Sequence, residues 1–410
     1  MGFDSALSGL SAASQDLDVI GNNVANSGTV GFKQSQIQFS DVYANTLAGN
    51  TSLEVGNGTK VAQVEQQFTQ GTITASQNPL DVAINGNGFF RLSSNGTPVY
   101  SRNGQFQLNN NGYLVNANGD KLMGYPVNSN GTIATGALGD LQISSADMSP
   151  SATTTVTAGL NLDASSTVPT TTPFNYNNPT SYNNSTAVTT YDSLGNTHNL
   201  QTYYVTNGTG SWNVYATLDG TPVGYTPPAA PVPITTLTFS SAGALSSGSP
   251  VTLSLPLTDG ATTPMSVALS YAGTTQYGAS FGVNSMQQNG YTTGQLSNFS
   301  IGSNGMITGN YTNGQSNNMG QVALANFTDP NGLQSIGNNE WTQTQASGPA
   351  LVGIPGSAAL GTLQSSAVES SNVDLTSQLV DMITAQRNYQ ANAETIKTED
   401  AITQTLMSLR

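Results

Sequence analysis

The chain has 410 residues, of which only 7% are charged, and its formal net charge is −14. An ordinary globular domain carries charge on about a quarter of its residues. No Lys or Arg occurs between Lys121 and Arg387, which argues against nucleic acid and anionic membrane surfaces as partners.

The length allows about two to four domains. The chain has no cysteine, which excludes disulfides, zinc–thiolate sites and cysteine nucleophiles. We see no cleavable signal peptide and no apolar run long enough to cross a bilayer, so we expect no membrane insertion. The Ser, Thr, Asn and Gly richness resembles that of exported surface proteins, and composition alone leaves the location open.

The first 28 residues have the apolar spacing of an amphipathic helix. Steps of four and three keep side chains on one side of a helix, and the residues that follow this spacing are Phe3, Leu7, Leu10, Leu17 and Val24. We expect the helix to end near Asn26, with Ser27-Gly28 supplying a left-handed residue. Residues 29–71 form a connecting segment of mixed pattern, which is long for a plain loop and therefore packs along another element.

Residues 72–148 change to a β pattern. Asn-Gly dipeptides recur about every eight residues, beginning at Asn87, Asn95, Asn103, Asn111 and Asn118. Asn-Gly favours the type I′ hairpin turn, so the pattern predicts an antiparallel meander.

Residues 149–283 show a second β pattern, with strict apolar alternation that predicts the half-buried strands of a sandwich or barrel. The alternating runs are Val156–Leu162, Trp212–Leu218, Val251–Leu257 and Val267–Tyr271. The first β style then returns over residues 284–372. The order predicts nested domains: a first β domain (72–148 and 284–372), an inserted outer β domain (149–283), and a terminal helical domain (1–28 and 373–410).

The C-terminal stretch predicts a long helix with an apolar seam and no Gly or Pro. Its seam residues are Leu375, Leu379, Met382, Tyr389, Ala393, Ile396 and, after a shift of phase, Leu406, and Asn372 or Asp374 can cap its start. The two terminal helices either pack within one chain or also pack against neighbouring copies. We favour the second interpretation, with both seams as the assembly interface of a coiled-coil-like inner domain. Because no adjacent element covers either seam, we expect both helices to be disordered in the monomer.

The residues offer little catalytic chemistry. The chain has one histidine, His198, so a multi-histidine metal site is excluded. We interpret His198 as a hydrogen-bonded turn histidine and Asp192 as a turn residue. The chain has no Walker lysine and no Gly-x-Gly-x-x-Gly motif before a helix, so nucleotide binding is not supported. We therefore expect no enzyme activity, no cofactor and no metal.

Several motifs resemble the bacterial flagellar rod, hook and hook-associated protein family. Asn23–Asn26 with Thr29, Gly31, Phe32 and Lys33 is similar to the family's N-terminal signature. The stretches Asn78–Phe90, Tyr100–Gly104 and Asp120–Tyr125 resemble its core motifs. At the other end, Glu369–Leu375, which includes Asn372 and Asp374, and Gln386–Ala393 resemble its C-terminal helix.

The resemblance implies a structural subunit of the flagellar hook, because the insertion around Tyr191–His198 resembles the hook rather than the shorter rod proteins. Such a subunit polymerises into a flexible tube, a universal joint that transmits torque from rod to filament. The implied partners are other copies of the chain, the rod, the hook–filament junction, the hook cap and the type III export apparatus. The implied location is extracellular, after export without a cleaved signal. The alternatives are a distal rod subunit and an exported β-sandwich adhesin or carbohydrate-binding protein.

Overall fold

The computed structural model describes residues 2–42, 56–128, 131–134, 136–208, 210–226 and 229–408. The protein is mainly β, with helix α1 (Gly2–Ala25) near the N-terminus and helix α2 (Leu375–Ser408) near the C-terminus, which confirms the predicted fold class. The chain divides into two compact units. The first unit comprises Met1–Ser145, Asn298–Gly309 and Ser316–Arg410, and the second comprises Ala146–Ser297 and Asn310–Gln315.

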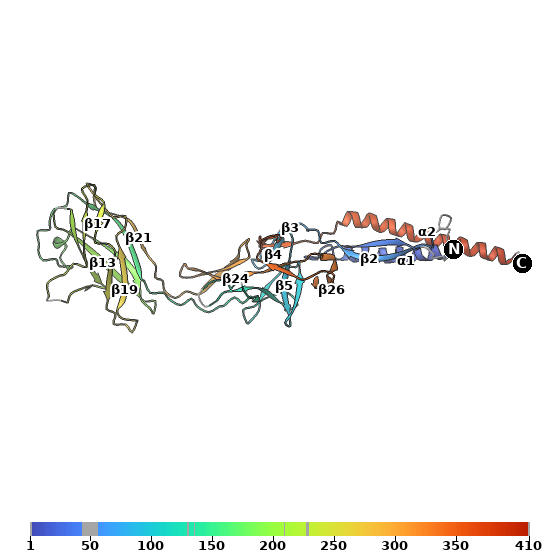
Figure 1. Cartoon of the computed structure of the whole chain (residues 1–410), viewed down its shortest axis with the longest axis horizontal. Coiled ribbons are helices and arrows are strands. Elements are labelled where there is room, and N and C mark those ends of the chain that lie inside the picture. The colour runs from blue at the N-terminus through green and yellow to red at the C-terminus, as the bar shows by residue number, and fades with distance from the viewer. Residues whose placement is uncertain are drawn as a thin grey trace. The chain divides into compact units, whose positions relative to one another are not determined.

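In the first unit the two helices lie side by side and run antiparallel (Figure 1). The end of α1 meets the start of α2, where Asn23 Nδ2 donates to Gln378 Oε1 at 3.0 Å. The hairpin of β1 (Ser35–Asp41) and β2 (Thr59–Gln66) packs along α1. The connecting segment therefore packs along another element as expected. The premise that no adjacent element covers either seam was wrong in part, because α1 packs on α2 and on the hairpin, whereas seam residues such as Leu7 and Leu379 stay exposed. Disorder of the helices in the monomer stays a prediction.

The chain leaves α1 differently from the prediction. Helix α1 ends at Ala25, and turns continue to Gly31. The left-handed residue is Gly31, with φ +71°, and not Gly28. Hydrogen bonds from the backbone N–H groups of Ser27 and Thr29 to the carbonyls of Val24 and Asn26 extend the turn beyond the predicted end.

The strands of the first unit form one large sheet and several small pairs. The small pairs are β1–β2, β3 (Ile73–Ala75) with β30 (Ala367–Glu369), and β4 (Val82–Asn85) with β29 (Thr362–Ser365). The large sheet contains β5 (Phe89–Ser94), β6 (Thr97–Ser101), β7 (Gln107–Leu108), β8 (Leu114–Val115), β9 (Lys121–Pro126), β10 (Gly139–Asp140), β22 (Leu296–Ile301), β23 (Met306–Tyr311), β24 (Ser316–Val322), β25 (Leu324–Asn326), β26 (Gln334–Gly337), β27 (Glu340–Thr342) and β28 (Leu351–Gly353). Strands from before and after the insertion pair, as nested domains require.

The Asn-Gly turns are of more than one kind. Between β5 and β6, Asn95 and Gly96 both have positive φ (49° and 88°), as a type I′ turn requires. Between β7 and β8 only the glycine, Gly112, is left-handed, and its N–H donates to the carbonyl of Asn109. The prediction of one turn type was wrong there, because the longer loop needs a single left-handed residue at its end.

The second unit contains two sheets that share a core. One sheet has the order β12 (Asn184–Tyr191), β13 (Thr197–Thr206), β14 (Ser211–Leu218), β16 (Thr235–Phe239), β17 (Leu245–Ser247), with β15 (Thr221–Pro222) on β14. The other has the order β18 (Val251–Leu255), β19 (Met265–Ser270), β11 (Thr155–Asp163), β20 (Thr275–Tyr277), with β21 (Gly282–Gln288) on β11. Leu160 and Val267 from one sheet pack in the same cluster as Trp212 and Leu237 from the other. The four alternating runs are confirmed as strands of a sandwich.

The pairing of β21 with β11 brings residues 282–288 into the second unit, which extends to Ser297. The finer division of the chain into inner helical, connecting, first β and outer β domains stays our proposal. Neither described helix is long and apolar enough to cross a membrane.

Candidate assembly site

The contact between the helices is made by small side chains on α1. Ala6, Ala13 and Ile20 are buried and lie seven residues apart, which is the spacing of a helix–helix seam. A Cβ placed on Gly9 would lie 2.9 Å from the side-chain amide atoms of Asn392 on α2. The two helices therefore approach closely, since only small residues fit at these positions.

The predicted seam residues fall into two groups. Met382, Ala393 and Ile396 of α2 and Leu10, Leu17 and Val24 of α1 are half-buried. The large side chains of Phe3, Leu7, Leu375, Leu379, Tyr389 and Leu406 are exposed, with Leu379 at 49% and Leu406 at 65%. The single chain thus brings part of each predicted seam toward the helix pair and leaves the rest on its surface.

More apolar surface continues along α2. Val380, Ile383, Ile402 and Met407 are also exposed, and every residue from Ala401 to Ser408 is exposed. Because Gly9 faces Asn392 in an antiparallel pair, the last turns of α2 continue past the N-terminal end of α1. An apolar surface of this size on a folded unit is typical of an interaction site.

A groove of about 570 Å³ lies between α1, α2 and β1. Asp16 of α1 and Asp381 of α2 both line it. Burial raises the pKa of Asp16 above its ordinary value of 3.8, and the nearby Asp381 raises it further. The groove is therefore acidic and is not covered within the single chain.

A buried ionic triad fixes both helices to the β structure. The Glu369 carboxylate lies 2.7 Å from Lys33 Nζ and 3.2 Å from Arg102 Nη1, and all three side chains are at most 3% exposed. Glu369 also accepts a hydrogen bond from the N–H of Gly71. Burial lowers the pKa of Lys33, an effect that attraction to Glu369 opposes. The triad joins the segment after α1, the segment before α2 and the β5–β6 sheet.

The remaining family-motif residues surround this triad. Gly31 N–H donates to the Glu369 carbonyl at 2.8 Å, Phe32 is buried, and Thr29 Oγ1 donates to Asn26 Oδ1 at 3.2 Å. Asn372 accepts from Gln34 N–H at 2.8 Å and donates to the Gln67 carbonyl at 2.7 Å. Asp374 caps α2 by accepting from Thr376 N–H at 2.8 Å, as predicted.

Together these contacts make a rigid base for a helical pair. The motif residues lie at the base of the helices, with Phe32 and Lys33 buried and Asn372 half-buried, whereas the exposed apolar residues lie along the helices. The geometry separates two tasks: holding the helices in position, and offering an apolar surface to another molecule.

Sequence reasoning missed the buried residues Ala6, Ala13 and Ile20 of α1. It included Arg102 and Glu369 in the family motifs but did not predict that they pair. The seven-residue spacing of alanines was a usable signal. For the triad the sequence signal was weaker: the chain has only eight Lys and Arg residues, so a basic residue within a motif is unusual.

Models of flagellar protein families match most of the chain. The "Flagella basal body rod protein" family matches residues 3–33 and the "Flagellar hook protein FlgE/F/G D1 domain" matches residues 83–164. The "Flagellar basal body protein FlaE D2 domain" matches residues 161–291, and the "Flagellar basal body rod FlgEFG protein C-terminal" matches residues 364–409.

Proteins from several bacteria are similar over their full length. The chain is 45% identical to the flagellar hook protein FlgE of Salmonella typhimurium over 416 residues, covering 100% of both chains. It is 44% identical to that of Escherichia coli over 417 residues, again covering 100% of both. The Borreliella burgdorferi FlgE is 32% identical over 450 residues, covering 99% of this chain and 98% of that protein.

Among solved structures, the Helicobacter pylori flagellar hook protein FlgE2 is similar in fold. The TM-score is 0.53 at 15% sequence identity, and the match covers 72% of this chain and 100% of that one.

Proposed function

This chain belongs to the flagellar hook protein family, and we propose that its paired terminal helices drive its polymerisation into the hook. The family is a structural one, and we propose no catalytic role for the chain. Its place is the flagellar hook, the tube that transmits torque from the rod to the filament.

The observation that carries the proposal is the apolar surface of the helical pair. About a dozen large apolar side chains of α1, α2 and the β1–β2 hairpin are exposed in the single chain. Complete burial of a fully exposed side chain of this kind contributes about 1.5–3 kcal/mol. These side chains are 38–72% exposed, so each contributes a part of that value, and together they support contacts with several neighbouring copies. The antiparallel pair and the buried triad hold the part of this surface that lies along α1 in a fixed shape, so less ordering entropy opposes assembly there.

The rest of the surface suits a joint that bends. With 7% charged residues, contacts between copies depend mainly on apolar packing and neutral hydrogen bonds. Few ion pairs would fix one register, so neighbouring copies can shift past one another. We propose that the chain is exported through the flagellar type III apparatus without a cleaved signal, and that it meets the rod, the cap and the hook–filament junction proteins.

A charge placed in the exposed seam tests the proposal. We expect Leu379→Asp to abolish tube formation, because the carboxylate would be buried without a partner in the assembled seam. The matched control is Leu379→Met, which keeps an apolar side chain of similar volume at the same exposed position of α2.

Tube formation is measured by electron microscopy after the protein is concentrated, and circular dichroism checks that each variant is folded. The proposal requires tubes from the Leu379→Met protein and none from the Leu379→Asp protein. Normal tubes from folded Leu379→Asp would show that the seam is not the polymer contact.

A further inference from the structure

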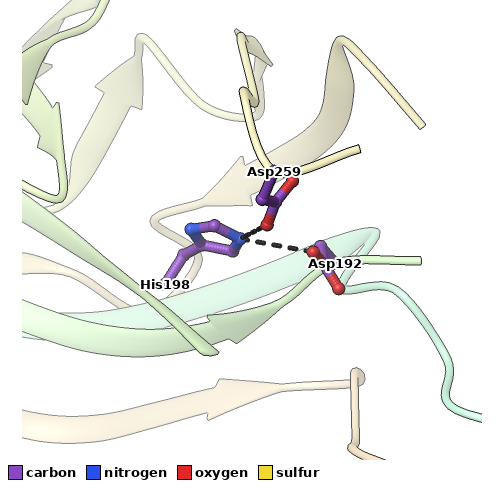
Figure 2. A group of neighbouring side chains, drawn as sticks. All are labelled: Asp192, His198 and Asp259. Carbon is purple, nitrogen blue, oxygen red and sulfur yellow. Dashed lines mark ion pairs between the residues drawn. The ribbon is translucent and has the colours of Figure 1, made fainter. Parts of the chain in front are cut away.

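The single histidine of the chain lies among carboxylates at one end of the second unit. His198 is in β13, Asp192 and Asn196 are in the turn between β12 and β13, and Asp259 is in the loop between β18 and β19. Figure 2 shows the imidazole directed at the Asp192 and Asp259 carboxylates. The three residues come from both sheets of the sandwich, so an ion held by them would connect the sheets.

A fourth residue, Asp219, determines the tautomer of His198 and therefore which ring nitrogen has a free lone pair. Nδ1 lies 2.6 Å from Asp219 Oδ2. A carboxylate can only accept, so Nδ1 carries the proton and the neutral ring has its lone pair on Nε2. Asp219 is itself held by the N–H of Asn199 at 2.7 Å. A carboxylate behind the far nitrogen is the arrangement that orients metal-binding histidines.

The distances from His198 Nε2 to the two carboxylates match those between ligands of a tetrahedral metal ion. Nε2 lies 3.3 Å from Asp259 Oδ2 and 3.5 Å from Asp192 Oδ2. Ligands about 2.0–2.2 Å from a tetrahedral zinc ion are roughly 3.3–3.5 Å apart. The Asn196 side-chain amide lies 2.9 Å from Asp192 Oδ2 and 3.2 Å from Asp259 Oδ2. A half-turn of this amide would present its oxygen as a fourth ligand.

The charges at this site are not balanced by the protein. Asp192, Asp219 and Asp259 surround one imidazole, and no Lys or Arg occurs anywhere between Lys121 and Arg387. The Asp192 side chain is fully buried. Its carboxylate accepts hydrogen bonds from the backbone N–H groups of Leu194 and Asn196 and from the Asn196 side-chain amide. Nε2 of His198 is enclosed and has no hydrogen-bond partner among the described residues.

We propose that Asp192, His198 and Asp259, completed by Asn196, bind one divalent transition-metal ion of the zinc type. Imidazole nitrogen with carboxylate oxygen is a ligand set that suits this class of ion. A hollow of about 210 Å³ lined by His198, Asp219 and Asp259 lies beside the cluster. The ion would clip the β12–β13 turn to the β18–β19 loop and stabilise the second unit. This site lies outside the helical assembly surface, so it stands independently of the proposed function, and it replaces our expectation of no metal.

The test uses the full chain without an affinity tag and ZnCl₂ as the probe. Burial lowers the pKa of His198, but attraction to Asp219, Asp192 and Asp259 outweighs this and raises it above 6.5. The titration is therefore done at about pH 8, where a proton competes least for Nε2. We expect calorimetry to give one Zn²⁺ per chain, and cobalt substitution to give the visible spectrum of a tetrahedral site.

Variants separate this site from adventitious binding. We expect His198→Gln to abolish the one-to-one binding and Asp219→Asn, which removes only the orienting carboxylate, to weaken it about 10–100-fold. Asp163→Asn removes the same charge elsewhere in the second unit and should bind Zn²⁺ as the unaltered chain does. Unfolding followed by Trp212 fluorescence confirms that each variant is folded.

The same fluorescence gives an internal control. Trp212 is in the core of the second unit and Trp341 is in the core of the first. In Trp341→Phe, where the fluorescence comes from Trp212, Zn²⁺ should raise the unfolding temperature. In Trp212→Phe, where the fluorescence comes from Trp341, Zn²⁺ should leave the unfolding temperature unchanged. No saturable binding to the unaltered chain, or equal binding by folded His198→Gln, would overturn the proposal.

Discussion

Glu369 is the residue on which the base of the helical pair depends. It is the anion between Lys33 and Arg102, and the pair that it forms with each is buried. Removing one partner of a buried ion pair leaves uncompensated charge, which costs more than the pair itself contributes. In this triad the loss of Glu369 would leave two cations unpaired. The family motif therefore has a structural reason: its charged members need one another to be buried.

We predict that Glu369→Gln lowers the free energy of unfolding of the first unit by about 3–5 kcal/mol. Urea unfolding followed by Trp341 fluorescence measures it. The control is Glu394→Gln, whose partner Lys397 is exposed, so no measurable change is expected. Equal effects of the two substitutions would mean that the triad does not hold the first unit together.

Gly31 is the second residue with a specific backbone task. Its φ is +71°, and a Cβ there would lie 2.6 Å from the backbone nitrogen of Asn103. We predict that Gly31→Ala destabilises the first unit by about 1–3 kcal/mol. Gly28→Ala is the matched control, because a Cβ on Gly28 meets nothing within 4 Å. Urea unfolding followed by Trp341 fluorescence measures both variants. An unchanged free energy of unfolding in Gly31→Ala would contradict the close approach to Asn103.

At the scale of elements, the helical pair contains an electrostatic conflict. Asp16 and Asp381 line the same groove from α1 and α2, and burial and Asp381 together raise the pKa of Asp16. A raised pKa means that the folded state binds the proton more tightly than the unfolded state does. The contribution of protonated Asp16 to the free energy of unfolding is therefore fully present below the ordinary pKa of 3.8. It is lost as the pH rises through the raised pKa of the folded state.

We predict that Asp16→Asn stabilises the helical pair at neutral pH, because it removes the charge that the fold disfavours. The gain should shrink as the pH is lowered and vanish near about pH 3, where Asp16 itself is protonated. Thermal unfolding followed by circular dichroism at several pH values measures the difference from the unaltered chain. Asp18→Asn, at an exposed position of α1, should give no such gain. A gain that does not depend on pH would rule out this explanation.

At the scale of the whole molecule, two units with separate cores carry different tasks. The first unit presents the helical assembly surface, and the second is a sandwich with its own core. Domains with separate cores can unfold separately. The chain has two tryptophans, and each unit contains one of them.

We predict two unfolding transitions that differ in urea midpoint. In Trp341→Phe the fluorescence comes from Trp212 and reports the second unit with its core unaltered. In Trp212→Phe it comes from Trp341 and reports the first unit in the same way. Coincident transitions in the two variants would show that the units unfold as one.

The sequence by itself determined the terminal helices, the strands of the sandwich and the nested order, because helix and strand periods are local properties of the chain. It did not determine the helical contact. We predicted the large residues Leu7 and Leu379 as an assembly seam, which stays a prediction, whereas the small residues buried along α1 in the single chain are Ala6 and Ala13. Which face of an amphipathic helix meets which neighbour depends on the position of that neighbour.

The buried triad and the histidine cluster were also beyond the sequence. Lys33 and Glu369 are 336 residues apart in the chain and 2.7 Å apart in space. His198 and Asp259 meet only because two sheets face each other over one core. The spacing of residues along the chain does not encode such encounters, so the tertiary structure alone brings these charges together.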